Sequence, residues 1–274
     1  MNADWAESLK ESMKQRGVIK MKFGVCGSLQ DAPVFQENGY DYFELNFSEW
    51  AAMEEDKFQE GKKTIEAMQF YPEAMNVMLP GEFHLTGENV DLAPVAEYLK
   101  KGFDRASQLH TEVVVFGSGR ARNLPEGFTD RAKAFDQLED FLNVAGDIAA
   151  SFGVTIAIEP LSFRESNIIN LVSEGAYLAA RVKKDSVRCL ADYFHMARNK
   201  EDCESIVACA PRMEHCHIAC PEGRVCPMPG NWDYTSFFEA LKKANYQKRV
   251  SIECGGADWK KDAGPALKFL KSYL

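Results

Sequence analysis

The 274-residue chain lacks the features that mark several large classes of protein. No apolar run approaches the roughly 20 residues that a helix needs to span a bilayer, so we expect no membrane span. Basic residues are outnumbered, 32 against 41 acidic residues, and the net charge is -9. Because such a charge repels phosphate backbones and anionic membranes, nucleic acid and membranes are disfavoured partners.

A cysteine framework is also missing. The eight cysteines form no CxxC pair and no regular spacing, and nothing near the N-terminus resembles a signal peptide. We therefore expect reduced thiols and a cytoplasmic location. A metal site made of thiolates is an alternative, because three cysteines are close in sequence: Cys216, Cys220 and Cys226. The spacings typical of zinc sites are absent.

No low-complexity linker, composition shift or longer internal repeat divides the chain. Single α/β barrels often reach about this length, which favours one domain. Residues 1–20 are polar, with Trp5, Leu9 and Met13 at helical spacing, and predict an N-terminal extension or a packed helix. Residues 21–274 are expected to form one catalytic domain.

From residue 21 onward, short β-rich runs alternate with longer helical patterns. Eight strands are predicted, at 22–26, 42–45, 74–78, 113–116, 155–159, 187–192, 213–218 and 250–253. The helical patterns between them include 95–109, 131–152 and 236–244. Eight such units predict a closed (β/α)8 TIM barrel, in which function lies at the C-terminal ends of the strands. The rival, a doubly wound open sheet, lacks its GxGxxG fingerprint in the first turn.

Four predicted strands carry, at or next to their C-terminal end, a residue that is costly to bury. These residues are Glu159, Asp192, His217 and Glu253, on strands five to eight. Neighbouring barrel strands converge on one axis, and carboxylates in contact repel one another unless a cation lies between them. A set of three carboxylates and one imidazole suits Mn²⁺, Mg²⁺ or Co²⁺, whereas zinc more often recruits thiolate or further histidine. The alternative is four separate salt bridges or loop caps.

Five other polar residues could belong to the site, and four of them also have an interpretation outside it. Glu44 ends the second strand and could contact substrate hydroxyls or close a salt bridge. In the loop GSGRARN, Arg120 and Arg122 could bind a phosphate or carboxylate, or face solvent. Asn170 could contact hydroxyls or cap the following helix. His215 precedes His217 by two residues, hence on the same side of its strand and one layer lower, which favours a partner of the metal ligand.

The series IAIEPL, LADYFH, EHCHIA followed by GR and PG, and SIECGG resembles the sugar isomerase and epimerase family of xylose-isomerase-like TIM barrels. That family includes ketose 3-epimerases, hydroxypyruvate isomerases and inosose dehydratases, and the resemblance covers residues 21–274. It implies one divalent metal ion, Mn²⁺ first, with Mg²⁺, Co²⁺ and Zn²⁺ as alternatives. The residues that match the family's metal ligands are Glu159, Asp192, His217 and Glu253.

The resemblance also implies roles in catalysis. Glu159 and Glu253 match the family's paired acid-base residues, while His195 and Arg224 match residues that hold the substrate's oxygens. The partner implied is a small sugar, free or phosphorylated, and the family's frequent dimers and tetramers leave a homo-oligomer open.

These residues predict a metal-dependent isomerase or epimerase that removes a proton next to a carbonyl and passes through an enediolate. Such a proton is acidic enough only where a base lies beside the carbon and positive charge lies beside the oxygen. An inosose-type dehydratase begins with the same step and remains the closest alternative. An apurinic-site endonuclease and a barrel that binds sugar without turnover are alternatives of other classes.

Overall fold

The computed structural model describes residues 20–274, so the predicted N-terminal segment lies almost entirely outside the described residues. In this part of the chain the strands are β1 (Lys22–Val25), β2 (Glu44–Asn46), β3 (Ala74–Asn76), β4 (Val113–Phe116), β5 (Thr155–Ile158), β6 (Val187–Asp192), β7 (Met213–Ile218) and β8 (Arg249–Ile252). The helices before β5 are α2 (Ala32–Glu37), α3 (Phe47–Ala52), α4 (Glu55–Met68), α5 (Ala93–Gln108), α6 (Gly119–Arg122) and α7 (Arg131–Ser151). Those after β5 are α8 (Val172–Val182), α9 (Tyr193–Asn199), α10 (Glu204–Cys209), the 3-10 turn η1 (Ala210–Arg212), α11 (Thr235–Lys243) and α12 (Trp259–Lys271).

The strands form one parallel sheet that curls into a nearly closed barrel, in the order β1-β8-β7-β6-β5-β4-β3-β2. At the seam between β1 and β2 the contact is short: an isolated bridge joins Cys26 to Glu44. There the Gly27 N–H donates to the Glu44 carbonyl over 3.0 Å. The predicted (β/α)8 TIM barrel is therefore confirmed. The division of the chain at residue 21 stays a prediction.

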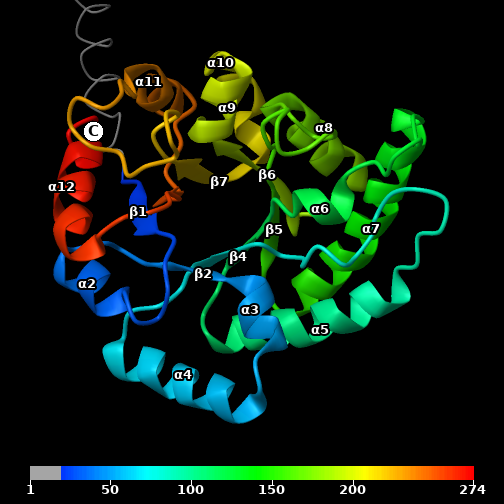
Figure 1. Cartoon of the computed structure of the whole chain (residues 1–274), viewed down its shortest axis with the longest axis horizontal. Coiled ribbons are helices and arrows are strands. Elements are labelled where there is room, and N and C mark those ends of the chain that lie inside the picture. Colours follow the sequence, from blue (N-terminus) through cyan, green and yellow to red (C-terminus); the bar gives the residue numbers. More distant parts are fainter. Residues whose placement is uncertain (1–19) are drawn as a thin grey trace, which may run out of the picture.

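The helices surround the strands, as Figure 1 shows, and the longer helices each bury one apolar face. In α7 the residues Ala134, Leu138 and Leu142 are buried at spacings of four, and the Asp130 side chain caps the helix by accepting from the Lys133 N–H. Spacings of three and four place side chains on a single helix face, which explains why this pattern predicted the element. None of the helices in residues 20–274 has the length and apolarity that crossing a membrane requires.

Two strands differ from their predicted limits by two residues, whereas the first, fifth and eighth strands differ by one. The predicted strand at 74–78 stops at Asn76, because Val77 has a positive φ of 52° and leaves the extended conformation. The predicted strand at 42–45 is shifted to Glu44–Asn46. Both differences place an asparagine, Asn46 or Asn76, at a strand end.

Inside the lower part of the barrel, the large side chain of Tyr42 occupies the space beside Gly24, which has no side chain. A Cβ on Gly24 would lie 2.2 Å from the ring of Tyr42, so the absence of a side chain on β1 leaves room for the tyrosine. The Tyr42 hydroxyl forms a 2.8 Å hydrogen bond with Ser251, on β8. This pair fixes how β1, β8 and the segment before β2 approach each other below the site.

We expect Gly24→Ala to destabilise the fold by about 1–3 kcal/mol, because the new methyl group overpacks the barrel. Urea denaturation followed by circular dichroism measures the change. The matched test is the same substitution in a Tyr42→Leu background, where the smaller side chain should remove much of the penalty. An equal penalty in both backgrounds would contradict the assignment of the clash to Tyr42.

Candidate active site

The structure brings the four predicted strand-end residues together at the C-terminal face of the barrel. One ligand atom from each of Glu159, Asp192, His217 and Glu253 lies within 4.8 Å of all the others. The strand register produces this arrangement, since Asp192 pairs with His217 and His217 pairs with Ser251. The His217 Nδ1 atom is 3.1 Å from Glu159 Oε1 and 3.3 Å from Glu253 Oε2. Sequence separations of up to 94 residues thus converge on one point.

One carboxylate oxygen of Asp192 accepts a hydrogen bond within the fold, and the other accepts none. Its Oδ1 accepts from the Phe194 N–H over 2.8 Å and so caps helix α9. Its Oδ2 is buried without a hydrogen-bond partner. A buried carboxylate oxygen without a partner is costly, and a cation is the ligand that relieves that cost.

The charges of the cluster also favour a cation. Burial raises the pKa of Glu159, and the neighbouring Glu253 carboxylate raises it further. Burial raises the pKa of Asp192 as well, with the charge of Glu159 in the same direction. Burial opposes ionisation of Glu253 too, but His217 and Arg224 lower its pKa to about 2. Three carboxylates that disfavour one another's charge, beside one imidazole, match the oxygen-rich ligand set of a divalent metal ion.

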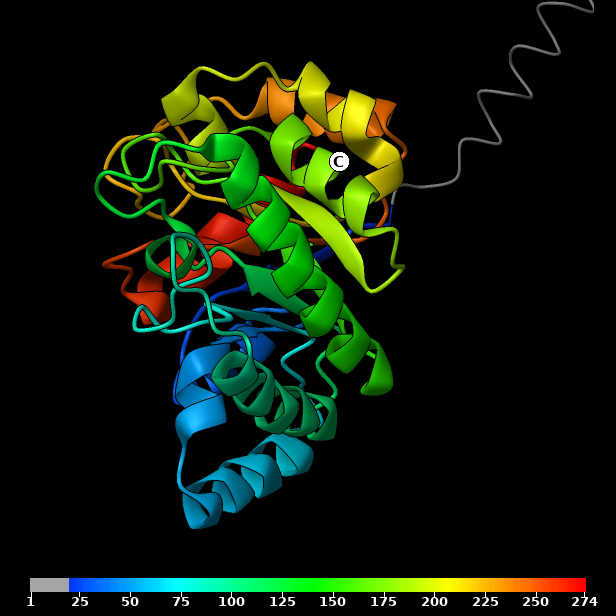
Figure 2. The same cartoon turned by 90° about the vertical axis from the view of Figure 1, so that its right-hand side faces the viewer.

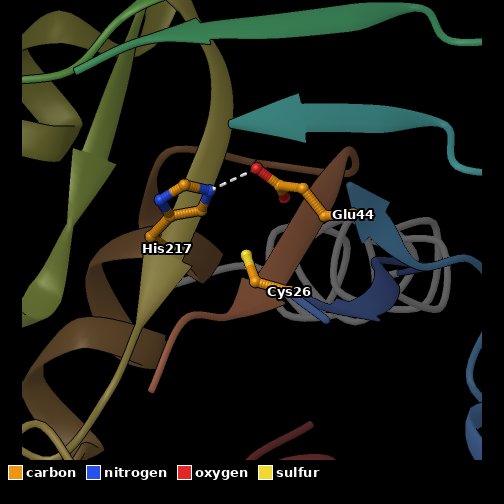
Figure 3. Close-up of side chains that lie close together, drawn as sticks. All are labelled: Cys26, Glu44 and His217. Carbon is orange, nitrogen blue, oxygen red and sulfur yellow. Dashed lines mark hydrogen bonds and ion pairs between the residues drawn. The ribbon is translucent and has the colours of Figure 1, made fainter. Parts of the chain in front are cut away.

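The Glu44 carboxylate contacts the imidazole of His217 through its Nε2 atom, as Figure 3 shows. Its Oε1 lies 3.0 Å from His217 Nε2, and its Oε2 lies 3.0 Å from His215 Nε2. When Nε2 of His217 donates to Glu44, Nδ1 faces the other three residues as a ligand atom. Burial would lower the pKa of His217, but the carboxylates of Glu44 and Glu253 raise it well above its usual value. A cation at Nδ1 would replace that proton.

The structure supports the ion-pair interpretation of Glu44. Each of its two carboxylate oxygens lies 3.0 Å from a histidine nitrogen, and the residue is 1% exposed. Glu44 therefore positions the His217 imidazole, and its predicted contact with substrate hydroxyls stays a prediction. Cys26 also lies beside this pair, within 4.8 Å of ligand atoms of Glu44 and His217.

His195 is held as a hydrogen-bond donor toward the site. Its Nδ1 accepts from the Ser162 N–H over 3.1 Å, so in the neutral ring the proton sits on Nε2. Nε2 lies 3.4 Å from Asp192 Oδ2, but the two atoms form no hydrogen bond, and Nε2 has no hydrogen-bond partner. Burial lowers the pKa of His195, which keeps the ring neutral near pH 7. This geometry suits a donor to an oxygen close to Asp192.

Arg224 reaches the site from the loop after β7. Its Nη2 is 2.5 Å from Glu253 Oε2, and its guanidinium lies over the Phe194 ring at 4.6 Å. Arg224 has a positive φ of 53° and follows Gly223 with 75°, so a sharp turn directs the side chain inward. Its predicted contact with substrate oxygens stays a prediction.

Two predicted substrate contacts lie outside this cluster. Asn170 is 2% exposed, and its amide donates to the carbonyls of Leu161 and Ser166. Its amide nitrogen thus shapes its own loop, and the predicted contact with substrate stays a prediction. Arg120 is exposed, with its aliphatic stem against Gly81.

The interpretation of Arg122 as an anion-binding residue is wrong. This side chain is fully buried and donates to the carbonyls of Phe116, Glu159 and Ile169. Because it joins the ends of β4 and β5, it supports the backbone of Glu159.

Sequence reasoning missed two residues of the site. Asn76 donates to Glu253 Oε1 over 3.0 Å and so fixes the rotation of that carboxylate. A Cβ on Gly117 would lie 2.0 Å from Glu159 Oε2, so this glycine makes room for the Glu159 carboxylate. A polar residue at a strand end could have indicated Asn76. The strand was predicted two residues too long, so Asn76 was not at its predicted end.

Comparison with known proteins gives a family and a set of relatives. A model described as xylose isomerase-like TIM barrel matches residues 34–273. D-psicose 3-epimerase from Agrobacterium fabrum (strain C58 / ATCC 33970) is 27% identical over 125 residues, which is 45% of this chain and 43% of that protein. L-ribulose 3-epimerase from Methylomonas sp. (strain DH-1) is 31% identical over 108 residues, 39% of this chain and 37% of that protein. The matches thus span less than half the length of these curated relatives.

Solved structures extend the likeness to nearly the whole chain. D-psicose 3-epimerase from Clostridium cellulolyticum H10, solved with D-tagatose, superposes with a TM-score of 0.81 at 16% identity. The superposition covers 93% of this chain and 99% of that one. At this identity the likeness concerns the fold.

Proposed function

The chain belongs to the xylose isomerase-like TIM barrel family, and from this premise we propose that it is a divalent-metal-dependent sugar epimerase acting next to a carbonyl group. The observation that carries the proposal is the convergence of Glu159, Asp192, His217 and Glu253, with an unpartnered oxygen on Asp192. The relatives named above are sugar epimerases, which supports the same reaction class. The cytoplasmic location and a homo-oligomer stay predictions.

These four residues would hold the metal ion, with Mn²⁺ as the first choice for a mainly oxygen donor set. When bound, it supplies a Lewis acid that stabilises negative charge on the carbonyl oxygen and orients the sugar. Glu44 fixes the His217 ring, and the Asp192 cap fixes that carboxylate, so the ligands are held in position before any sugar binds.

The proton transfers fall to the two glutamates. One carboxylate takes the proton from the carbon next to the carbonyl, and the electron pair of the broken C–H bond moves into an enediolate. The other glutamate, in its acid form, gives a proton to the opposite face of the same carbon and inverts it. Which glutamate acts as the base and which as the acid depends on which of the two epimers is bound. His195 Nε2–H and the Arg224 guanidinium are donors on hand for the substrate's oxygens.

The test is a panel of ketoses incubated in D₂O with the full chain and added Mn²⁺. We expect the proton signal of one carbon next to the carbonyl to disappear from the NMR spectrum while the epimer accumulates. Chelation before the incubation should stop both changes. A dehydratase would instead release water from the sugar and yield an unsaturated or deoxy carbonyl product. The absence of exchange with every free, phosphorylated and glycosylated ketose in the panel would reject the proposal.

A further inference from the structure

A cavity of about 640 Å³ opens beside the metal cluster, between the barrel seam and helices α3 and α4. Its inner end is lined by Glu44, which bonds His217, and by Asn76, which bonds Glu253. None of the four predicted metal ligands lines it. The cavity therefore lies next to the cluster, one layer of side chains away from the predicted ligands.

The seam of the barrel explains why there is space here. Strands β1 and β2 meet at one bridge only, so the loop after β1 and the end of β2 diverge above it. Helix α4 lies at the outer side of this seam, and Figures 1 and 2 both show it at the periphery of the ring of helices. Trp50 forms part of the wall, and Gly61 of α4 approaches its ring so closely that a Cβ there would lie 2.6 Å from it.

The wall is fixed by the fold. Arg105 is 4% exposed and donates to the carbonyls of Trp50 and Ala51 and to that of Met53, at the end of α3. Its other nitrogen is 2.8 Å from Glu55, in the first turn of α4. A buried arginine thus ties together the two helices that enclose the cavity, which gives a preformed site.

The size of the cavity exceeds what the distal part of one sugar requires. At about 30 Å³ for each water-sized group, it holds on the order of twenty such groups, whereas a whole six-carbon ketose has about twelve heavy atoms. The reacting carbons of that ketose must also lie at the metal cluster, outside the cavity. The space left over corresponds to a second sugar unit.

The lining chemistry fits hydroxyl groups and disfavours an anion. The apolar part of the wall comes from Leu29, Trp50 and Met53, and the polar part includes Gln30, Asn46, Glu49, Lys57, Glu60 and Thr64. Within residues 20–274, the side chains of Glu49, Lys57 and Glu60 form none of the ion pairs, so they are available to a ligand. Both Glu44 oxygens contact histidines, so the charged groups free for a ligand are two carboxylates, Glu49 and Glu60, and the ammonium group of Lys57. That balance repels a phosphate, whereas an apolar surface with carboxylate acceptors suits the face and hydroxyls of a sugar ring.

We infer that this cavity is a subsite for a second, uncharged sugar unit, so that the substrate is a glycosylated ketose rather than a free or phosphorylated monosaccharide. The inference rests on the proposed epimerase activity. It names the class of substrate and leaves the proton transfers unchanged.

The experiment compares D-fructose, D-fructose 6-phosphate and isomaltulose, a fructose that carries glucose on its far end, with the Mn²⁺-loaded full chain in D₂O. We expect kcat/KM for exchange of the C3 proton to be at least about tenfold higher for isomaltulose than for either of the others. Thr64→Trp, which places a bulky ring into the cavity from α4, should lower the isomaltulose-to-fructose ratio at least tenfold. The matched control is Glu66→Trp, on the same helix but outside the lining, and it should leave the ratio unchanged.

The outcomes separate the two proposals. If D-fructose exchanges its proton but isomaltulose is no better, or if Thr64→Trp and Glu66→Trp give the same ratio, the subsite is refuted and the epimerase remains. Preference for D-fructose 6-phosphate also refutes it. If none of the three sugars exchanges and the wider ketose panel fails as well, the epimerase proposal fails and the subsite fails with it.

Discussion

Glu253→Gln and Glu159→Gln should each lower the epimerisation rate by about 10²–10⁴-fold, because an amide cannot take or return the proton. The amide keeps the size and most of the hydrogen bonds of the carboxylate, so the barrel should remain folded. The sharper readout is exchange in D₂O measured separately on the two epimers of a substrate pair. Each variant retains one carboxylate, so it should exchange the proton of one epimer only, and the two variants should differ in which one.

Both glutamates also belong to the predicted metal site, so the assays need saturating Mn²⁺ and a direct measurement of metal binding. Glu126→Gln is the matched control, because Glu126 is exposed and lies far along the chain from the strand ends of the cluster. Wild-type rates in both Gln variants would eliminate the two-base mechanism. Weaker Mn²⁺ binding with exchange rates that return to the wild-type value as Mn²⁺ is raised to saturation would assign the glutamates to the metal alone.

The fold and the centre of the site were predictable because their signals are local. An apolar run that ends in Asp192 or Glu253 predicts a strand and also predicts that the charged residue lies at the end of that strand. Barrel geometry then brings these ends to one axis, whatever the intervening sequence. The same logic placed His215 one layer below His217, where it contacts Glu44.

The supporting residues were not predictable, because their roles depend on packing between distant segments. Arg122 in a glycine-rich loop fits an anion site as well as it fits three backbone carbonyls, and only the approach of β4 to β5 decides between them. The role of Asn76 was not predicted, because Val77 leaves the extended conformation and ends the strand. No local sequence pattern indicates this change. The cavity under α4 depends on the single bridge at the barrel seam, and no motif encodes it.

Gly117→Ala is expected to reduce turnover by about 10²-fold without touching any proposed ligand or acid-base group, because a displacement of about 1 Å at a reacting group has an effect of this size. The new Cβ would lie 2.0 Å from Glu159 Oε2 and 3.2 Å from its Cδ, so the carboxylate must move. Little else can give way, since Arg122 holds the Glu159 carbonyl and His217 lies 3.1 Å from the other oxygen. Steady-state kinetics and a Mn²⁺ titration measure the loss.

The backbone at Gly117 has no positive φ, so an alanine there introduces a contact and no conformational strain. Gly255→Ala, on the loop after β8, is the matched control: its Cβ would meet nothing within 4 Å, and its φ is also not positive. The loss in Gly117→Ala should appear as weaker Mn²⁺ binding and lower kcat together, because Glu159 serves the metal and the proton in the proposed mechanism. If Gly117→Ala binds Mn²⁺ and turns over like Gly255→Ala, then Glu159 is not held in the position that the mechanism requires.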